Sequence, residues 1–373
     1  MTENPLRKLE SFGQSIWLDF IRRGMLDSGE LAQLIEDDGL GGVTSNPAIF
    51  QKAIAETGDY DEAIRALAQH SAEEIYNRLT VEDIRRTADL FRPIHEKTDG
   101  RDGFVSLEVS PHLARDTAGT LLEARRLWQE VGRPNVMIKI PGTREGLPAI
   151  RQLIGEGLNI NVTLLFGLPR YREVAEAYLS GLEERVAEKR PLQGVSSVAS
   201  FFLSRIDVLV DPLLERTVEE GGPAAFLAAE LRGEVAIASA KAAYQIYREF
   251  FGGERFRKLA EKGAFSQRLL WASTGSKNPE YSDVKYVEAL IGPETVNTVP
   301  LETLTAYRDR GRPEARLTEG VMEAMRRLER LPEVGIDLDT LTRQLEDEGQ
   351  EKFVKPFDSL MKSLELKRLD ALR

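Results

Sequence analysis

Eight short apolar runs rich in β-forming residues alternate with helical stretches along the first 300 residues of this chain, and few architectures accommodate that order. The runs occupy residues 15–20, 42–46, 104–109, 136–141, 159–166, 194–201, 269–274 and 295–299. Helical patterns lie between them, for example at 29–38, 81–97, 116–131, 146–155, 168–189 and 280–290. Strands that alternate with helices form a parallel sheet. Eight such units predict an α/β fold with a closed (β/α)₈ TIM barrel.

The alternative is an open, doubly wound Rossmann-type sheet, which requires a glycine fingerprint after its first strand. Ile21-Arg22-Arg23-Gly24 follows the first run and contains no such fingerprint. A barrel needs about 250 residues, so this chain of 373 residues has room for additional helices.

We expect a long helical insertion at 206–267, between strands six and seven, with an alanine-rich helical pattern from 223 to about 250. Two amphipathic helices are expected at 317–331 and 341–372. No linker or internal repeat interrupts the chain. We therefore predict a single domain over 1–373, with a barrel core at about 15–310 and a C-terminal helical extension at about 311–373.

Composition excludes several classes of site. The chain has no cysteine, so it has no disulfide, thiolate zinc site or cysteine nucleophile. Its three histidines, His70, His95 and His112, are far apart and form no metal-ligand motif. These features disfavour a zinc-dependent aldolase or hydrolase.

The net charge of −11 disfavours nucleic acid or an anionic membrane as the main partner. No run approaches the roughly 18 apolar residues of a membrane span. The N-terminus is polar and lacks the apolar core of a signal peptide. These features predict a cytoplasmic protein.

Lys139 lies inside a run, Val136-Met137-Ile138-Lys139-Ile140-Pro141, that otherwise has the pattern of a buried strand. Burying an ammonium group costs several kcal/mol unless the group is paired. The same burial favours the free amine, which attacks a carbonyl and forms a Schiff base. The structural alternative is a lysine at a strand end that reaches water or pairs with an acid.

Other reactive side chains stand where the predicted strands end, which is the face that carries the active site in such barrels. They are Asp19, Asn46, Glu108, Lys139, Asn161, Thr163, Ser200, Arg205 and the stretch from Ser273 to Lys277. Each also has a structural explanation: Asp19 could cap a helix, and Asn46 before Pro47 could form a turn. Together they offer an acid, an amine, amides and hydroxyls that can converge.

This set of groups fits Schiff-base cleavage of a carbon–carbon bond. Lys139 would attack a ketone, and Glu108 would donate the proton needed to lose water from the carbinolamine. Asp19 would accept the proton of the hydroxyl next to the cleaved bond. The two carboxyl groups would need environments that separate their pKa values. The enamine hydroxyls and a water would be held by Asn46, Asn161 and Thr163.

Two segments are candidates for phosphate binding. Ser200 and Arg205 flank the end of the sixth strand, and Ser273 to Lys277 follow the seventh. Loops after strands seven and eight often bind phosphate in barrels, and arginine contacts phosphate through two parallel hydrogen bonds. The glycine spacing excludes a Walker loop. An ordinary surface role for Arg205 is the alternative.

Four segments make the chain similar to the transaldolase family. Thr44-Ser45-Asn46-Pro47, within 42–50, resembles the family's T-[ST]-N-P signature. Residues 136–153 resemble the signature around the Schiff-base lysine, and 161–166 and 200–205 resemble two further blocks in the same order. The resemblance extends from about 15 to 300, and segment 271–279 is similar to the longer bacterial branch.

The resemblance implies a role for each matching residue. Lys139 would be the Schiff-base lysine, Glu108 the acid/base acting through a water that Thr163 helps to hold, and Asp19 the group that takes and returns the hydroxyl proton. The substrate-binding residues would be Asn46, Asn161, Ser200, Phe202 and Arg205. Thr44, in the first signature, and Ser273 and Lys277, after strand seven, are further candidates for substrate binding. Other branches carry a second phosphate-binding arginine after strand seven, whereas here the nearest basic residue is Lys277.

The implied reaction belongs to the non-oxidative pentose phosphate pathway. A dihydroxyacetone unit would pass from sedoheptulose 7-phosphate to glyceraldehyde 3-phosphate, giving erythrose 4-phosphate and fructose 6-phosphate. No cofactor or metal is implied. The partners would be phosphorylated sugars, and the protein could be a monomer or a homodimer.

Two alternatives remain open. A fructose-6-phosphate aldolase-like enzyme would release free dihydroxyacetone, but such relatives are shorter and use a tyrosine for much of the acid/base work, so Glu108 and the chain length favour transfer. A non-catalytic sugar-phosphate-binding barrel would need no buried amine, so Lys139 beside Glu108 and Asp19 argues against it.

Overall fold

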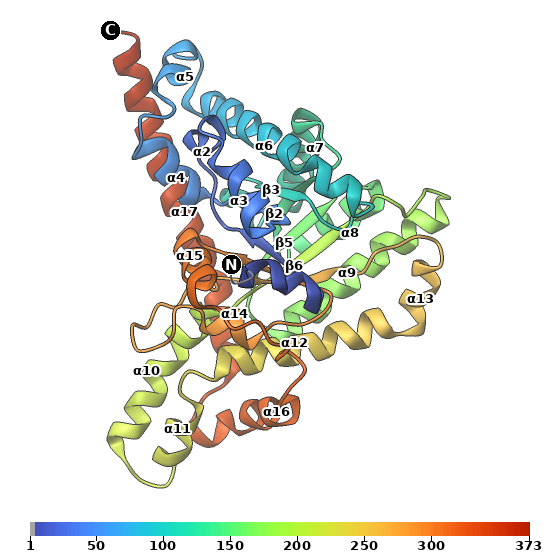
Figure 1. Ribbon diagram of the computed structural model, residues 1–373, viewed down its shortest axis with the longest axis vertical. Helices are drawn as coiled ribbons and strands as arrows, with labels where there is room; N and C mark the ends of the chain where they lie inside the picture. Colours follow the sequence, from blue (N-terminus) through green and yellow to red (C-terminus); the bar gives the residue numbers. More distant parts are fainter. Residues whose placement is uncertain (1–3) are drawn as a thin grey trace.

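The computed structural model describes residues 4–373 and confirms the predicted closed barrel, with helices around the strands (Figure 1). Every strand pairs in parallel with the next, and β8 pairs with β1. The strands are β1 Gln14–Leu18, β2 Gly42–Val43, β3 Phe104–Glu108, β4 Val136–Pro141, β5 Ile160–Leu165, β6 Ser197–Phe202, β7 Arg268–Ala272 and β8 Thr295–Val299.

The strands are buried on both faces, which is why they have apolar patterns without simple alternation. Every residue of β3, β4, β5, β6 and β8 is buried. Two short segments precede β1, namely α1 Pro5–Lys8 and η1 Leu9–Phe12. Apart from those between β6 and β7, the helices and 3₁₀ turns that connect the strands are α2 Arg23–Asp27, α3 Glu30–Asp38, α4 Pro47–Ala55, α5 Asp61–Ala66, α6 Ala72–Lys97, η2 Pro111–Leu113, α7 Thr117–Val131, α8 Gly146–Glu156, α9 Leu168–Ala187 and α14 Lys285–Ala289.

Some helix boundaries differ from those expected from the sequence. Helix α6 begins at Ala72 rather than at 81, because Ser71 and Glu74 form a capping box that satisfies its first backbone N–H groups. The stretch expected at 280–290 is helical only over Lys285–Ala289. Helices α4 and α5, between β2 and β3, were not among the expected elements.

The insertion between β6 and β7 forms four helices, α10 Ser204–Glu220, α11 Ala225–Leu231, α12 Val235–Gly252 and α13 Glu254–Ala260. The alanine-rich pattern expected over 223–250 is therefore two helices. The break contains Gly233, whose φ of +75° is left-handed and favours glycine.

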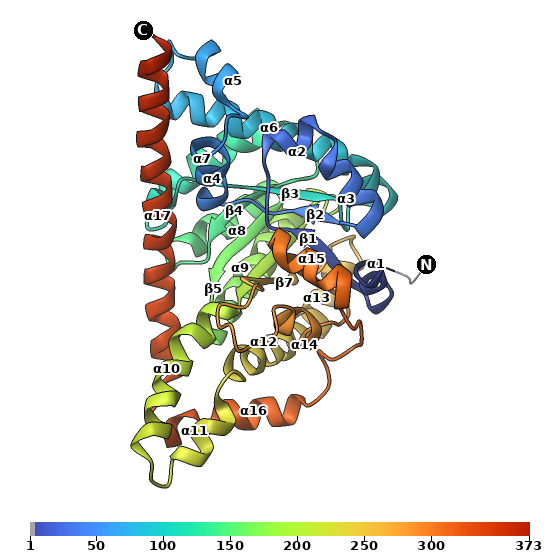
Figure 2. The same ribbon diagram turned by 60° about the vertical axis from the view of Figure 1, so that its left-hand side comes forward.

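The chain after β8 forms α15 Leu301–Arg310, α16 Val321–Arg330, η3 Leu331–Val334 and the long helix α17 Leu338–Ala371. Helix α17 packs against α4, α10, η2 and β5. Because α4, η2 and α10 directly follow the ends of β2, β3 and β6, α17 crosses the carboxyl-terminal face of the barrel. Figure 2 shows it running along one side of the molecule, from near α11 to α5.

No helix in residues 4–373 is both long enough and apolar enough to cross a membrane.

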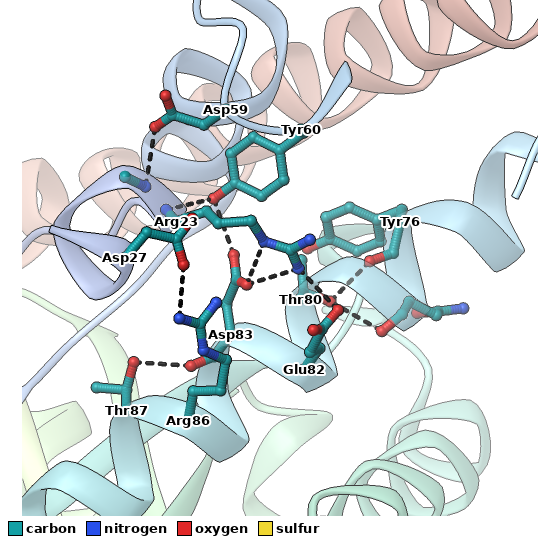
Figure 3. Close-up of polar contacts among 12 residues, drawn as sticks. Arg23, Asp27, Asp59, Tyr60, Tyr76, Thr80, Glu82, Asp83, Arg86 and Thr87 are labelled. Carbon is teal, nitrogen blue, oxygen red and sulfur yellow. Dashed lines mark hydrogen bonds and ion pairs between the residues drawn. The ribbon is translucent and has the colours of Figure 1, made fainter. Parts of the chain in front are cut away.

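A buried polar cluster joins α2 to α6 at the periphery of the barrel (Figure 3). Asp83 is fully buried, and its carboxylate accepts hydrogen bonds from Arg23 Nε at 2.9 Å and from the Tyr60 hydroxyl at 2.8 Å. The Tyr60 hydroxyl in turn accepts one from the Arg23 backbone N–H at 3.0 Å. The nearby pair between Asp27 and Arg86, at 2.6 Å, is exposed.

We expect Asp83→Ala to lower the free energy of unfolding by about 3 kcal/mol, because it leaves a guanidinium and a phenol without their buried partner. Asp27→Ala removes a solvated pair and should cost at most about 1 kcal/mol. Urea unfolding of both variants measures the difference. Equal losses in the two variants would contradict a stabilising role for the buried cluster.

Candidate active site

Lys139 and Glu108 face each other on adjacent strands inside the barrel. The register of β3 and β4 pairs Glu108 with Lys139, and Lys139 Nζ lies 3.1 Å from Glu108 Oε2. The two side chains are 5% and 4% exposed, respectively. Lys139 Nζ also donates a hydrogen bond to the Ser45 carbonyl at 3.1 Å. The predicted lysine is therefore buried, and its partner is an acid.

Burial raises the pKa of Glu108 to about 7, although the neighbouring Lys139 lowers it. Neither carboxyl oxygen of Glu108 has a partner in good hydrogen-bond geometry among residues 4–373. A carboxyl group with a pKa near neutrality can both donate and accept a proton at physiological pH. Glu108 therefore has the acidity that a general acid/base needs.

Asp19 follows β1 and belongs to the same charged group. Burial raises its pKa, and the charges of Lys139 and Arg205 lower it by smaller amounts. The Thr44 hydroxyl lies 2.6 Å from Asp19 Oδ1, to which it donates, and 2.7 Å from the Thr298 hydroxyl. This chain of hydroxyls fixes the orientation of the Asp19 carboxylate.

A layer of amides and hydroxyls adjoins Lys139. The register pairs Lys139 with Asn161 on β5. The Asn161 amide donates to the Ser106 hydroxyl at 3.0 Å, and its oxygen accepts from the Ser200 hydroxyl at 2.7 Å. The hydroxyl of Thr163, two residues further along β5, is buried and has no hydrogen-bond partner in the described part of the chain.

Asn46 has a structural role as well as a place near the site. Its side-chain oxygen accepts hydrogen bonds from the Ala48 and Ile49 backbone N–H groups, each at 3.0 Å, and so caps α4. The amide NH₂ group is then the part of Asn46 available to a ligand. The Ser45 carbonyl that contacts Lys139 precedes this cap, so the start of α4 also positions the lysine's acceptor.

Arg205 lies in the first turn of α10, directly after β6. Its Cζ is 5.4 Å from the centre of the Phe202 ring. Burial lowers the pKa of Arg205, whereas the Asp19 and Glu108 carboxylates raise it. Arg205 Nη1 is buried without a hydrogen-bond partner among the described residues, so this donor has unused capacity to bind an anion.

Ser273 and Lys277 differ in their placement. The Ser273 hydroxyl lies 2.8 Å from the Ser204 hydroxyl, beside Arg205, and its φ of +54° marks a tight turn after β7. Lys277 is exposed and lines a hollow of about 260 Å³ with Ser204, Asp207 and Tyr281. The structure thus brings both residues near the start of α10: Ser273 by a hydrogen bond to Ser204, and Lys277 through the hollow that it lines with the same residue.

Sequence reasoning missed four contributors to this site. Ser106 precedes Glu108 by two residues, so the period of two along a strand could have indicated it. Thr298 lies near the end of β8, and its position at a strand end could likewise have indicated it. Ser45 contributes only a backbone carbonyl. Phe353 is on α17, and its ring centre lies 5.5 Å from Lys139 Nζ; no local pattern connects it to the barrel.

Residues 4–373 contain no group of three or more histidine, aspartate or glutamate side chains placed to hold a metal ion.

Comparisons with known proteins place the chain among its relatives. Residues 16–364 match the family model described as Transaldolase/Fructose-6-phosphate aldolase. The chain is 49% identical over 372 residues to "Transaldolase 2" of Nostoc sp., covering 98% of both proteins. It is 47% identical over 366 residues to "Transaldolase" of Saccharopolyspora erythraea, covering 97% of both.

We expect Glu108 to make stability fall as the pH rises through about 7. Its folded pKa, about 7, is above its ordinary value of 4.5, so the folded state binds more protons between these values. The free energy of unfolding of Glu108→Gln minus that of the natural protein, both measured in urea, should therefore increase from about pH 5 to about pH 8. A difference that does not change with pH would contradict the raised pKa.

Proposed function

The chain belongs to the transaldolase/fructose-6-phosphate aldolase family, and we propose that it transfers a dihydroxyacetone unit between phosphorylated sugars through a Schiff base on Lys139. The observation that carries this proposal is the buried pair of Lys139 and Glu108 on adjacent strands, with 3.1 Å between amine and carboxylate. Schiff-base formation requires a nucleophilic amine and an acid/base whose pKa lies near the working pH.

The first step forms the Schiff base. Schiff-base formation uses the free amine of Lys139, and Glu108, 3.1 Å away, is placed to accept the proton that the lysine gives up. The free amine attacks C2 of the ketose to give a carbinolamine. Glu108 then protonates the C2 hydroxyl, directly or through a water, and water leaves to give the iminium. The Thr163 hydroxyl, which is buried and has unused hydrogen-bonding capacity, would hold that water.

The second step breaks the bond between C3 and C4. Asp19 takes the proton of the C4 hydroxyl, and the electrons of the C3–C4 bond move into the iminium to give an enamine on Lys139. An aldose phosphate leaves. A different aldose phosphate then accepts C3 of the enamine, and Asp19 returns the proton to the new hydroxyl. Hydrolysis of the resulting iminium releases the new ketose and the lysine.

The remaining residues would hold the substrate. Asn161 makes two hydrogen bonds within the barrel, which leaves one N–H and one lone pair for a hydroxyl of the three-carbon unit. The Asn46 NH₂ group would bind another hydroxyl. At the other end of the site, Ser200 and the unpaired Nη1 of Arg205 would bind the phosphate, and Phe202 would orient the guanidinium.

The donor and acceptor that fit this scheme are sedoheptulose 7-phosphate and glyceraldehyde 3-phosphate, with erythrose 4-phosphate and fructose 6-phosphate as products. The names of the relatives support transfer over release of free dihydroxyacetone. The family description covers both reactions, and Glu108 as the acid/base is the feature of this chain that favours transfer.

Several predictions from the sequence stay predictions. They are the single-domain organisation, the cytoplasmic location, the monomeric or dimeric state, and a phosphate-binding role for Lys277 and Ser273.

We expect borohydride reduction in the presence of fructose 6-phosphate to attach a three-carbon adduct to Lys139, found by intact mass and peptide mapping. Lys139→Ala should form no adduct and should have no measurable turnover, with an unchanged circular dichroism spectrum. Lys362→Met, which removes an exposed lysine of α17, is the matched control and should react as the natural protein does. An active Lys139→Ala variant would exclude the Schiff-base mechanism on this residue.

We expect Glu108→Gln to lower kcat by about 10²- to 10⁴-fold, the usual contribution of a general acid/base, with a much smaller change in KM. The glutamine keeps the shape of the side chain but cannot exchange a proton. Steady-state kinetics measures both constants. A change confined to KM would indicate that Glu108 only positions the substrate.

A further inference from the structure

Phe353 covers the space between the nucleophile and the phosphate-binding arginine. Its ring centre is 5.5 Å from Lys139 Nζ and 5.8 Å from Arg205 Cζ. The residue is 4% exposed. It comes from α17, near the end of the chain, whereas the other groups of the site come from the barrel strands and the loops that follow them.

The packing of α17 explains this placement. A side chain at Gly349 would meet Leu164 Cδ2 at 3.1 Å and the Phe166 ring at 3.4 Å, so the glycine lets the helix lie directly on the rim of the barrel. Phe353 is one turn further along the same face of the helix, because residues four apart are neighbours. Phe357, one turn beyond, packs edge-on against Tyr76 at 5.4 Å and anchors the next turn.

Arg205 lies against two aromatic rings. The centre of the Phe202 ring is 5.4 Å from Arg205 Cζ, and that of Phe353 is 5.8 Å from the same atom. Arginine stacks favourably on aromatic faces. Phe353 therefore contacts both cations of the site, and an apolar ring in that place brings no hydrogen-bonding group of its own.

We propose that Phe353 is a specificity-determining residue that keeps water from the Schiff-base intermediate, so that the three-carbon unit is transferred to a sugar acceptor rather than released. This inference rests on the proposed function. It assigns to the C-terminal helix α17 a direct part in selecting between the two outcomes of one intermediate.

The chemistry of release shows why water matters. Release begins when C3 of the enamine takes a proton, which gives an iminium. Water then adds to C2, the resulting carbinolamine loses the Lys139 amine, and free dihydroxyacetone leaves. Transfer instead forms a bond from C3 to the carbonyl carbon of an aldose. Both outcomes end with water adding to C2 of an iminium, so the difference lies at C3. An apolar cover that keeps water from C3 of the enamine slows the proton transfer that begins release, since exclusion of water prevents side reactions of reactive intermediates.

The test compares Phe353→Leu with Phe357→Leu, a matched change one turn along the same helix that lies against Tyr76 and His112 instead of Lys139. Fructose 6-phosphate is the donor and erythrose 4-phosphate is the acceptor. The readout is the ratio of free dihydroxyacetone formed to sedoheptulose 7-phosphate formed. We expect Phe353→Leu to raise the ratio by about tenfold, and Phe353→Ala by more, because each lets water into the site.

Phe357→Leu should leave the ratio unchanged. The ratio is a property of the active molecules, so partial unfolding of a variant does not change it. An unchanged ratio in both Phe353 variants would overturn the inference. An equal rise in Phe353→Leu and Phe357→Leu would also overturn it, because the cause would then be a looser helix and not the ring.

Borohydride trapping on the natural protein separates this inference from the proposed function. If Lys139 forms the three-carbon adduct and the Phe353 variants keep the natural ratio, only the role of Phe353 is wrong. If the natural protein forms no adduct, the proposed function fails first, and this inference fails with it.

Discussion

The buried contact between Lys139 and Glu108 is the interaction on which the rest of the site depends. An ammonium and a carboxylate in a dry barrel are costly to bury, and their attraction offsets that cost only in close geometry. The parallel register of β3 and β4 places the two residues side by side, and closure of the barrel keeps them there. The raised pKa of Glu108 reflects that cost, and it suits the acid/base role proposed for this residue.

Each neighbouring group limits the freedom of this pair. The Ser45 carbonyl accepts a hydrogen bond from Lys139, and Asn46 fixes that loop by capping α4. Thr44 and Thr298 hold Asp19, and Ser106 and Ser200 hold Asn161. Most of the polar residues at this face thus have one contact within the barrel and some capacity left for a ligand. The structural explanations weighed for these residues therefore apply, and they leave room for the substrate-binding roles proposed for the same residues.

Helix α17 brings an aromatic side chain to the face of the barrel that carries Lys139. It is an amphipathic helix whose buried face includes Leu345, Gly349, Phe353, Phe357 and Leu360. Gly349 allows close approach, and Phe353, one turn further along, lies against Lys139. A helix with an ordinary packing pattern thereby places one ring of its buried stripe beside the buried lysine of the barrel.

The sequence alone determined the barrel, because the order of eight strands and their helices is a local pattern repeated along the chain. It also determined Lys139, Glu108, Asp19, Asn161 and Arg205 as candidates, since the ends of parallel strands meet at one face. Helix boundaries near Ala72 and Gly233 followed from capping and backbone conformation, which apolar periodicity does not show. Only the tertiary structure decided that Phe353 lies over Lys139 and that the Ser273 hydroxyl meets the Ser204 hydroxyl at the start of α10. These positions depend on how distant helices and loops pack against the barrel, which no local pattern encodes.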